Sequence, residues 1–119
     1  MDTRCLGRKG EDAAANYIVS QGGIILTRNF FFKGGEIDIV AKDRFFNEDY
    51  ICFIEVKARN SDKNGYPEEA VTLSKQKKII RGALFYLNYK KIGTNVPIRF
   101  DVISILDNEV KWIKNAFTM

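Results

Sequence analysis

The chain contains no histidine, only two cysteines and only two prolines among its 119 residues. Without histidine there can be no Ser-His-Asp or Cys-His triad, no imidazole acid–base chemistry and no histidine-ligated metal. Cys5 and Cys52 are too few for a disulfide framework or a four-ligand zinc site. Any catalysis must therefore depend on carboxylates, lysines, hydroxyl groups or a bound cation.

Long apolar runs are also missing from the chain. No segment approaches the roughly 20 apolar residues that cross a bilayer, and the N-terminus lacks the apolar core of a signal peptide. We therefore expect a cytoplasmic protein that does not contact the membrane. With 45% hydrophobic and 29% charged residues, the composition is that of a globular protein, and the length fits a single domain over residues 1–119. The net charge of +4 is compatible with a polyanionic partner.

The hydrophobic periodicity predicts an α/β fold with a single mixed β-sheet and flanking helices. Helices are expected over residues 6–21, ended by the glycine pair at 22–23, and from an N-cap at Ser74 to about Lys90. Strands are expected over 24–30, 36–41, 50–58, 98–106 and, more weakly, 109–113, with polar loops over 42–49 and 59–66. The order is αβββαβ followed by the weak strand, and a right-handed crossover places the fourth strand parallel to the third.

The third predicted strand carries charge where a buried strand is normally apolar. Its even positions over 52–58 are apolar or small, whereas its odd positions change from apolar residues to Glu55 and Lys57. A strand that is apolar on both faces is covered on both sides. The charged end therefore indicates a central strand that emerges into a cleft.

An antiparallel hairpin of the second and third strands brings charges from both strands to one end of the sheet. In the register that places Val40 opposite Phe53, Asp38 lies opposite Glu55. Two facing carboxylates repel each other and favour a bound cation, and an all-oxygen ligand set indicates Mg²⁺ or Mn²⁺. Lys57 projects from the same face as Glu55, where an ammonium group can orient a water or balance charge on a phosphate.

The same residues carry a resemblance to a known family. The segments GEIDIV (35–40) and FIEVKAR (53–59) resemble the signature GEIDLIA…FVEVKxR of the YraN-like family, and the likeness covers nearly the whole chain. These small bacterial proteins are regarded as relatives of Holliday-junction resolvases within the PD-(D/E)xK nuclease superfamily. The resemblance implies a restriction-endonuclease-like core, although Ile37 replaces the proline of the PD signature.

The resemblance also implies an activity and its residues. We expect a metal-dependent endonuclease that hydrolyses DNA phosphodiester bonds, with branched or junction DNA as a candidate substrate. Asp38 and Glu55 would bind Mg²⁺ or Mn²⁺, and Lys57 would assist the attacking water. Resolvase-like members place a further glutamate on the first helix, where Glu11 is a candidate metal ligand. In the alternative interpretation, Glu11 only complements the dipole at the helix N-terminus.

Basic and aromatic residues supply candidate contacts with a nucleic acid. Lys75 and Lys78 at the start of the second long helix, together with Arg59, are expected to bind backbone phosphates. The family places Lys75 near the active site, although a solvated helix face explains the same run of charge. The aromatic residues at 30–32 and 45–46 can stack on bases, form the surface of a homodimer or pack in the core.

Two other functions fit the sequence. A non-catalytic nucleic-acid-binding module can retain the nuclease fold, although such a module gains nothing from acidic residues that face phosphate. A structural or interaction protein can use Glu36, Asp38, Glu55 and Lys57 as a charge network, including a simple salt bridge between Glu36 and Lys57. A titration with divalent cations separates this last function from the other two.

Overall fold

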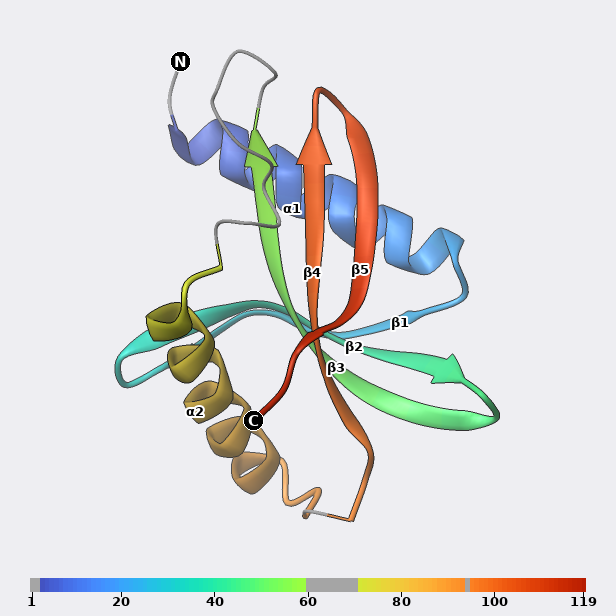
Figure 1. The fold of residues 1–119 in the computed structure, drawn as a ribbon, viewed down its shortest axis with the longest axis vertical. Helices are drawn as coiled ribbons and strands as arrows, with labels where there is room; N and C mark the ends of the chain where they lie inside the picture. Colours follow the sequence, from blue (N-terminus) through green and yellow to red (C-terminus); the bar gives the residue numbers. More distant parts are fainter. Residues whose placement is uncertain (1–2, 60–70, 94) are drawn as a thin grey trace.

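The computed structural model describes residues 3–59, 71–93 and 95–119, in which a five-stranded mixed sheet lies between two helices (Figure 1). The strand order is β1-β2-β3-β4-β5, and neighbouring strands are antiparallel except for β3 and β4, which are parallel. This arrangement confirms the predicted α/β class and the predicted parallel pairing of the third and fourth strands. The elements are α1 (Thr3–Ser20), β1 (Ile24–Phe32), β2 (Gly35–Phe45), β3 (Glu48–Arg59), α2 (Leu73–Tyr89), β4 (Ile98–Leu106) and β5 (Glu109–Phe117).

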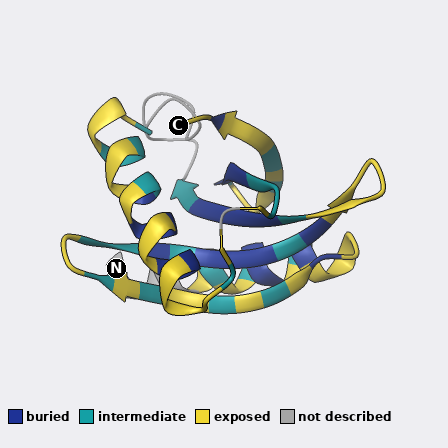
Figure 2. Cartoon of the chain, turned by 90° about the horizontal axis from the view of Figure 1, so that it is seen from below, coloured by how far each residue is buried: buried dark blue, intermediate teal, exposed yellow. Residues whose placement is uncertain are grey.

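The two helices cover opposite faces of the sheet, and each closes its own hydrophobic core. The core under α2 includes Ile37, Val40, Phe53, Ile79 and Tyr86. The core under α1 includes Ala14, Ile18, Ile39, Ile54 and Ile103. Strand β3 contributes to both cores, as its apolar residues on both faces predict. Figure 2 shows the buried residues running through the middle of the sheet, with exposed residues on the outer sides of the helices.

Two glycines let the helices approach the sheet closely. A Cβ atom on Gly10 would lie 2.9 Å from the Cβ of Ala58, so α1 crosses β3 at this point. A Cβ atom on Gly82 would overlap the ring of Phe32 and lie 2.9 Å from Cδ1 of Ile37, so α2 crosses the β1–β2 hairpin there. These crossing points fix where the residues next to them on each helix lie above the sheet.

The predicted loop over residues 42–49 is wrong, because β2 and β3 continue almost to their connection. Only Phe46 and Asn47 connect them, and both have positive φ, at 50° and 65°. A two-residue turn of this kind matches the twist of the flanking strands, so the hairpin can remain paired to its end. Strand β5 likewise extends beyond its predicted end, to Phe117.

Two further boundaries differ from the predictions. The N-cap of α2 is Thr72 rather than Ser74, because the Thr72 hydroxyl accepts a hydrogen bond of 3.1 Å from the backbone N–H of Lys75. Arg59 ends β3 instead of opening a loop, and the rest of that predicted loop lies outside the described residues. Among the described residues, no helix is long and apolar enough to cross a membrane.

Candidate functional site

Strands β2 and β3 separate at the position where the sequence predicts the site. Their pairing includes Val40 with Phe53, which confirms the predicted register, and ends at Ile39 with Ile54. Asp38 and Glu55 are the next residues beyond this last pair. Asp38 therefore does not simply face Glu55 across a regular ladder. The strands diverge at the residues that carry the acids, and this divergence opens the end of the sheet.

The divergence coincides with an irregularity in β2 that alternation alone does not predict. Ile37 belongs to the core under α2, whereas Ile39 belongs to the core under α1. Alternation along the strand predicted over 36–41 places both isoleucines on one face, so that expectation is wrong. The pairs Arg28–Ile39 and Phe30–Ile37 of β1 and β2 flank Asn29, which has a φ of 56°. A left-handed residue at this point bends the hairpin.

Asp38 is held by the backbone of the neighbouring strand. Its Oδ2 accepts a hydrogen bond of 2.8 Å from the backbone N–H of Val56, the second residue beyond the end of the β2–β3 pairing. Burial raises the pKa of Asp38, and the bond from Val56 and the charges on Lys75 and Lys57 oppose that rise. Its carboxylate is thus oriented by the strand from which β2 departs.

Glu55 is the most deeply buried acid of the site, with only 5% of its surface exposed. Its Oε1 lies 3.6 Å from Nζ of Lys57 and 3.7 Å from Nζ of Lys75. Within the described part of the chain, the buried Oε2 has no hydrogen-bond partner. Burial and then the charge of Asp38 raise the pKa of Glu55 to about 7, against the smaller effects of the two lysines.

Two more glutamates interact with Asp38. Burial and the charge of Asp38 raise the pKa of Glu36, whose carboxyl group also shares a hydrogen bond with Asp38. Burial, then the charges of Asp38 and Glu36, raise the pKa of Glu11, and Asn29 hydrogen-bonds its side chain. We call Glu11, Glu36, Asp38 and Glu55 the acidic cluster. It combines α1, β2 and β3, and Glu36 is the member that the sequence assigned to no catalytic or metal-binding role.

The donor set fits a hard divalent cation with few protein ligands. All members of the acidic cluster offer oxygen, which Mg²⁺ and Mn²⁺ prefer, and Mg²⁺ commonly binds one or two carboxylates and keeps several waters. The Oε2 of Glu55, which has no hydrogen-bond partner among the residues described, is a buried acceptor of the kind that a cation satisfies. Across the ranges that the structure describes, no group of three acidic or cysteine side chains is close enough to hold a metal ion. Asp38 and Glu55 are therefore the two candidate ligands, and the predicted role of Glu11 as a ligand stays a prediction.

Of the predicted basic residues, Lys75 contacts these acids. Lys75, on the first turn of α2, reaches Glu55 directly. Lys78 is exposed on the same helix, and Arg59 is half-buried at the end of β3, two residues beyond Lys57. The fold thus brings Asp38, Glu55, Lys57 and Lys75 together, and it places Lys78 and Arg59 outside the contacts of the acidic cluster.

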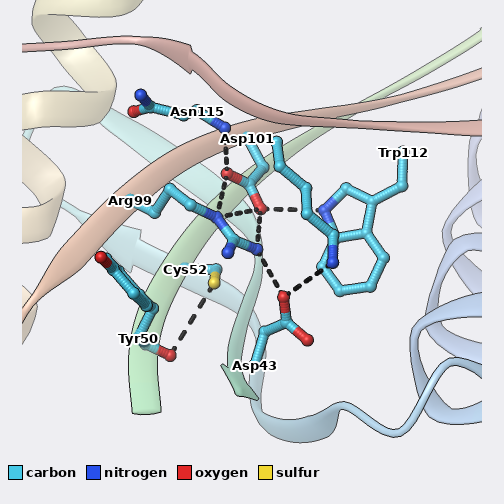
Figure 3. Close-up of polar contacts among 8 residues, drawn as sticks. Asp43, Tyr50, Cys52, Arg99, Asp101, Trp112 and Asn115 are labelled. Carbon is cyan, nitrogen blue, oxygen red and sulfur yellow. Dashed lines mark hydrogen bonds and ion pairs between the residues drawn. The ribbon is translucent and has the colours of Figure 1, made fainter. Parts of the chain in front are cut away.

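A second network of charged residues lies within the sheet and stabilises it (Figure 3). The Nη2 atom of Arg99 lies 2.8 Å from Oδ2 of Asp43 and 2.8 Å from Oδ2 of Asp101. Asp101 also accepts hydrogen bonds of 2.8 Å from the indole of Trp112 and 2.9 Å from the backbone N–H of Asn115. The bonds and charge of Asp101 raise the pKa of Arg99 although burial alone would lower it. The sequence signal for this network is the pair of charges at 99 and 101 in an otherwise apolar strand.

An αβββαβ core with buried acids where a mixed sheet opens is compatible with a nuclease-like α/β protein. The chain belongs to the uncharacterised protein family UPF0102, whose family model matches residues 10–105. UPF0102 is the YraN family, so the resemblance drawn from the sequence is confirmed.

Relatives of this family align along nearly their full length. A UPF0102 protein of Lachnoclostridium phytofermentans is 43% identical over 98% of this chain and 96% of its own. A UPF0102 protein of Clostridioides difficile is 45% identical over 98% of this chain and all of its own. A third, from Thermodesulfovibrio yellowstonii, is 46% identical over 94% of this chain and 95% of its own.

Proposed function

We propose that this protein is a metal-dependent endonuclease that hydrolyses DNA phosphodiester bonds, with branched or junction DNA as the first substrates to test. The observation that supports the proposal most is the environment of Glu55. Among the described residues, this buried carboxylate has one oxygen without a hydrogen-bond partner, and it has a second acid beside it and two lysines at its rim. Burying such a group costs stability that a purely structural role would not require.

In this proposal Asp38 and Glu55 hold Mg²⁺ or Mn²⁺. A cation bound there would supply a water of lowered pKa and polarise the scissile phosphate. The N–H of Val56 keeps the carboxylate of Asp38 oriented, so the ligand geometry is fixed before substrate arrives. Glu36, hydrogen-bonded to Asp38, supports that orientation from the same strand.

Lys57 and Lys75 act on the substrate side of the acids. The ammonium of Lys57 lies on the same strand as Glu55, two residues further along, where it donates hydrogen bonds to the attacking water or to a phosphate oxygen. Lys75 places a second positive charge near the same carboxylate, at the first turn of a helix. Lys78 and Arg59 extend this positive charge outwards and would contact phosphates on either side of the cut.

The experiment incubates the protein with linear, flapped and four-way-junction DNA in Mg²⁺, in Mn²⁺ and in EDTA. Cleavage is expected with either cation. It should be lost in Asp38→Asn and Glu55→Gln and reduced at least about 100-fold in Lys57→Gln. Glu48→Gln, which removes an exposed acid at the β2–β3 turn, is the matched control and should cleave normally.

Two results would contradict the proposal. Cleavage that persists in Asp38→Asn would come from a contaminating nuclease. DNA binding without cleavage of any substrate, in either cation, would instead support a non-catalytic nucleic-acid-binding module that retains the fold.

A further inference from the structure

An aromatic groove lies between the end of β1 and the outer side of α2. Its volume is about 410 Å³, within the range of about 300–1,000 Å³ typical of small-ligand sites. Tyr89 is 72% exposed and Phe85 is 46% exposed, so the groove presents rings to solvent. Phe31 is also exposed, but Phe30 and Phe32 pack towards α2, so the alternation along β1 turns the Phe31 ring to the other face of the sheet. The residues that line the groove are Phe30, Phe31, Phe32, Lys33, Phe85 and Tyr89.

The rings of this groove lie at stacking distance from one another. Phe32 stacks on Phe85 with 6.0 Å between ring centres, and Phe30 stacks on Phe32 at 6.4 Å. Tyr89 lies 6.5 Å from Phe30 with its ring tilted by 38°. Aromatic faces arranged in this way accept flat π systems, and every nucleobase has such a face.

Two smaller hollows, of about 240 and 370 Å³, continue the groove along α2. The first shares Phe85 and is also lined by Arg81, Leu84 and Asn88. The next shares Leu84 and Asn88 and reaches Lys91. Together they form a track along one side of the helix rather than an isolated pocket, which suits an extended ligand.

The charge around this track favours a polyanion. Neither β1 nor α2 contains an acidic residue, whereas α2 carries Lys75, Lys77, Lys78 and Arg81. Lys33 lines the groove itself. Phe31 is paired with Glu36 of β2, and the carboxyl group of Glu36 is hydrogen-bonded to Asp38. A second copy of the chain on this face would bring two acid-free, basic helices together, which opposes self-association here.

The track lies on the same helix as the lysine that contacts the acidic cluster, and on that helix it begins at Arg81, six residues beyond Lys75. Lys75 contacts Glu55 from the first turn of α2, and Phe85 follows ten residues later on the same helix. At a rise of 1.5 Å per residue, the two positions are about 15 Å apart along the axis. At the 3.4 Å rise of one strand in a stacked duplex, this length corresponds to about four nucleotides.

We infer that the aromatic groove binds unpaired bases of a single-stranded segment of the substrate, about four nucleotides from the phosphate at the acidic cluster. The inference depends on the proposed function only in taking DNA as the substrate. It adds that the preferred DNA carries a single-stranded segment, and that stacking on Phe85 and Tyr89 recognises it. Stacking does not distinguish base sequence, so recognition depends on the unpaired state.

The test measures binding of a labelled 12-nucleotide oligothymidine and of a 12-base-pair blunt duplex by fluorescence anisotropy in EDTA. Tyr89→Ala and Phe85→Ala remove rings that are 72% and 46% exposed, so the fold is expected to persist. Each should weaken binding of the single strand about tenfold and change duplex binding less than twofold. Tyr89→Trp should keep the wild-type affinity, and Lys33→Gln should lower the salt dependence of single-strand binding by roughly one phosphate contact.

Phe46→Ala is the matched control, because Phe46 is 85% exposed but lies at the β2–β3 turn. Its single-strand affinity should remain that of the wild type. Equal losses in Tyr89→Ala and Phe46→Ala, or equal losses for single strand and duplex, would overturn the inference. A wild-type dimer that Tyr89→Ala converts to a monomer in sedimentation, with unchanged oligothymidine binding, would also overturn it and assign the groove to a second copy.

Failure of this inference and failure of the proposed function give different results. If no DNA is cleaved but Tyr89→Ala loses single-strand binding, the groove assignment holds and the nuclease proposal fails. If Asp38 and Glu55 are required for cleavage but Tyr89→Ala binds and cleaves flapped DNA normally, the nuclease proposal holds and the groove assignment fails.

Discussion

Replacing Glu55 by glutamine is expected to stabilise the metal-free protein at pH 8 by about 3 kcal/mol and to leave its stability nearly unchanged at pH 4. Glutamine has almost the volume of glutamate, so the substitution mainly removes the charge. The wild-type charge lies at a side chain that is 5% exposed, with Oε1 near two lysines and Oε2 unpaired within the described residues. The lysines compensate for only part of the cost of burial.

The magnitude follows from the pKa of Glu55, which burial and the charge of Asp38 raise from 4.5 to about 7. Each pH unit between the folded and unfolded pKa corresponds to about 1.4 kcal/mol. Between pH 4.5 and about 7, the folded protein binds more protons at this site than the unfolded chain does. The stability that the protonated carboxyl contributes is therefore fully present below pH 4.5 and is lost as the pH rises to about 7. The glutamine variant does not titrate, so it avoids this loss.

The assay is urea denaturation in EDTA from pH 4 to pH 8.5, with the free energy of unfolding compared at each pH. The difference between Glu55→Gln and wild type should grow from near zero to its plateau over the range of pH 4.5 to 7. Glu48→Gln is the control, because it removes the same charge from an exposed position, and it should show no such growth. A Glu55→Gln variant less stable than wild type at pH 8 would refute the reasoning, since the lysine contacts would then outweigh the burial.

Further predictions concern the Arg99 network, the cation and the buried thiol. Asp101→Ala should lower the free energy of unfolding by about 3–5 kcal/mol in urea titrations, because it leaves the buried charge of Arg99 without its main partner; a loss below 1 kcal/mol would contradict this. Mg²⁺ or Mn²⁺ at a hundredfold excess over its dissociation constant should stabilise the wild type by about 2.7 kcal/mol in thermal melts and should stabilise Asp38→Asn much less. Equal gains in stability for the two proteins would place the cation elsewhere. Burial raises the pKa of the Cys52 thiol to about 12. In a Cys5→Ser variant, iodoacetamide should therefore label Cys52 only when the protein unfolds, which mass spectrometry would detect. Rapid labelling of the native protein would refute the burial of Cys52.

The sequence by itself determined the element order and the candidate catalytic strand, because these depend on short-range periodicity. The alternation along β3 shows where its apolar pattern changes to Glu55 and Lys57, and the register with β2 follows from matching apolar positions. Gly22, with a φ of 92°, ends α1 at the expected place. All these features are local to a strand, a turn or a hairpin, so a pattern of a few residues was sufficient.

The tertiary structure alone decided how the acids meet and what surrounds them. Beyond Ile39, β2 leaves β3, so Asp38 accepts the N–H of Val56 instead of facing Glu55 in a regular ladder. Lys75 reaches Glu55 from a helix that begins 18 residues after it along the chain. The aromatic groove forms because α2 crosses the β1–β2 hairpin at Gly82, which brings Phe85 onto Phe32. Such contacts depend on strand twist and helix crossing points, which are set by the packing of the whole core and leave no periodic signal in the sequence.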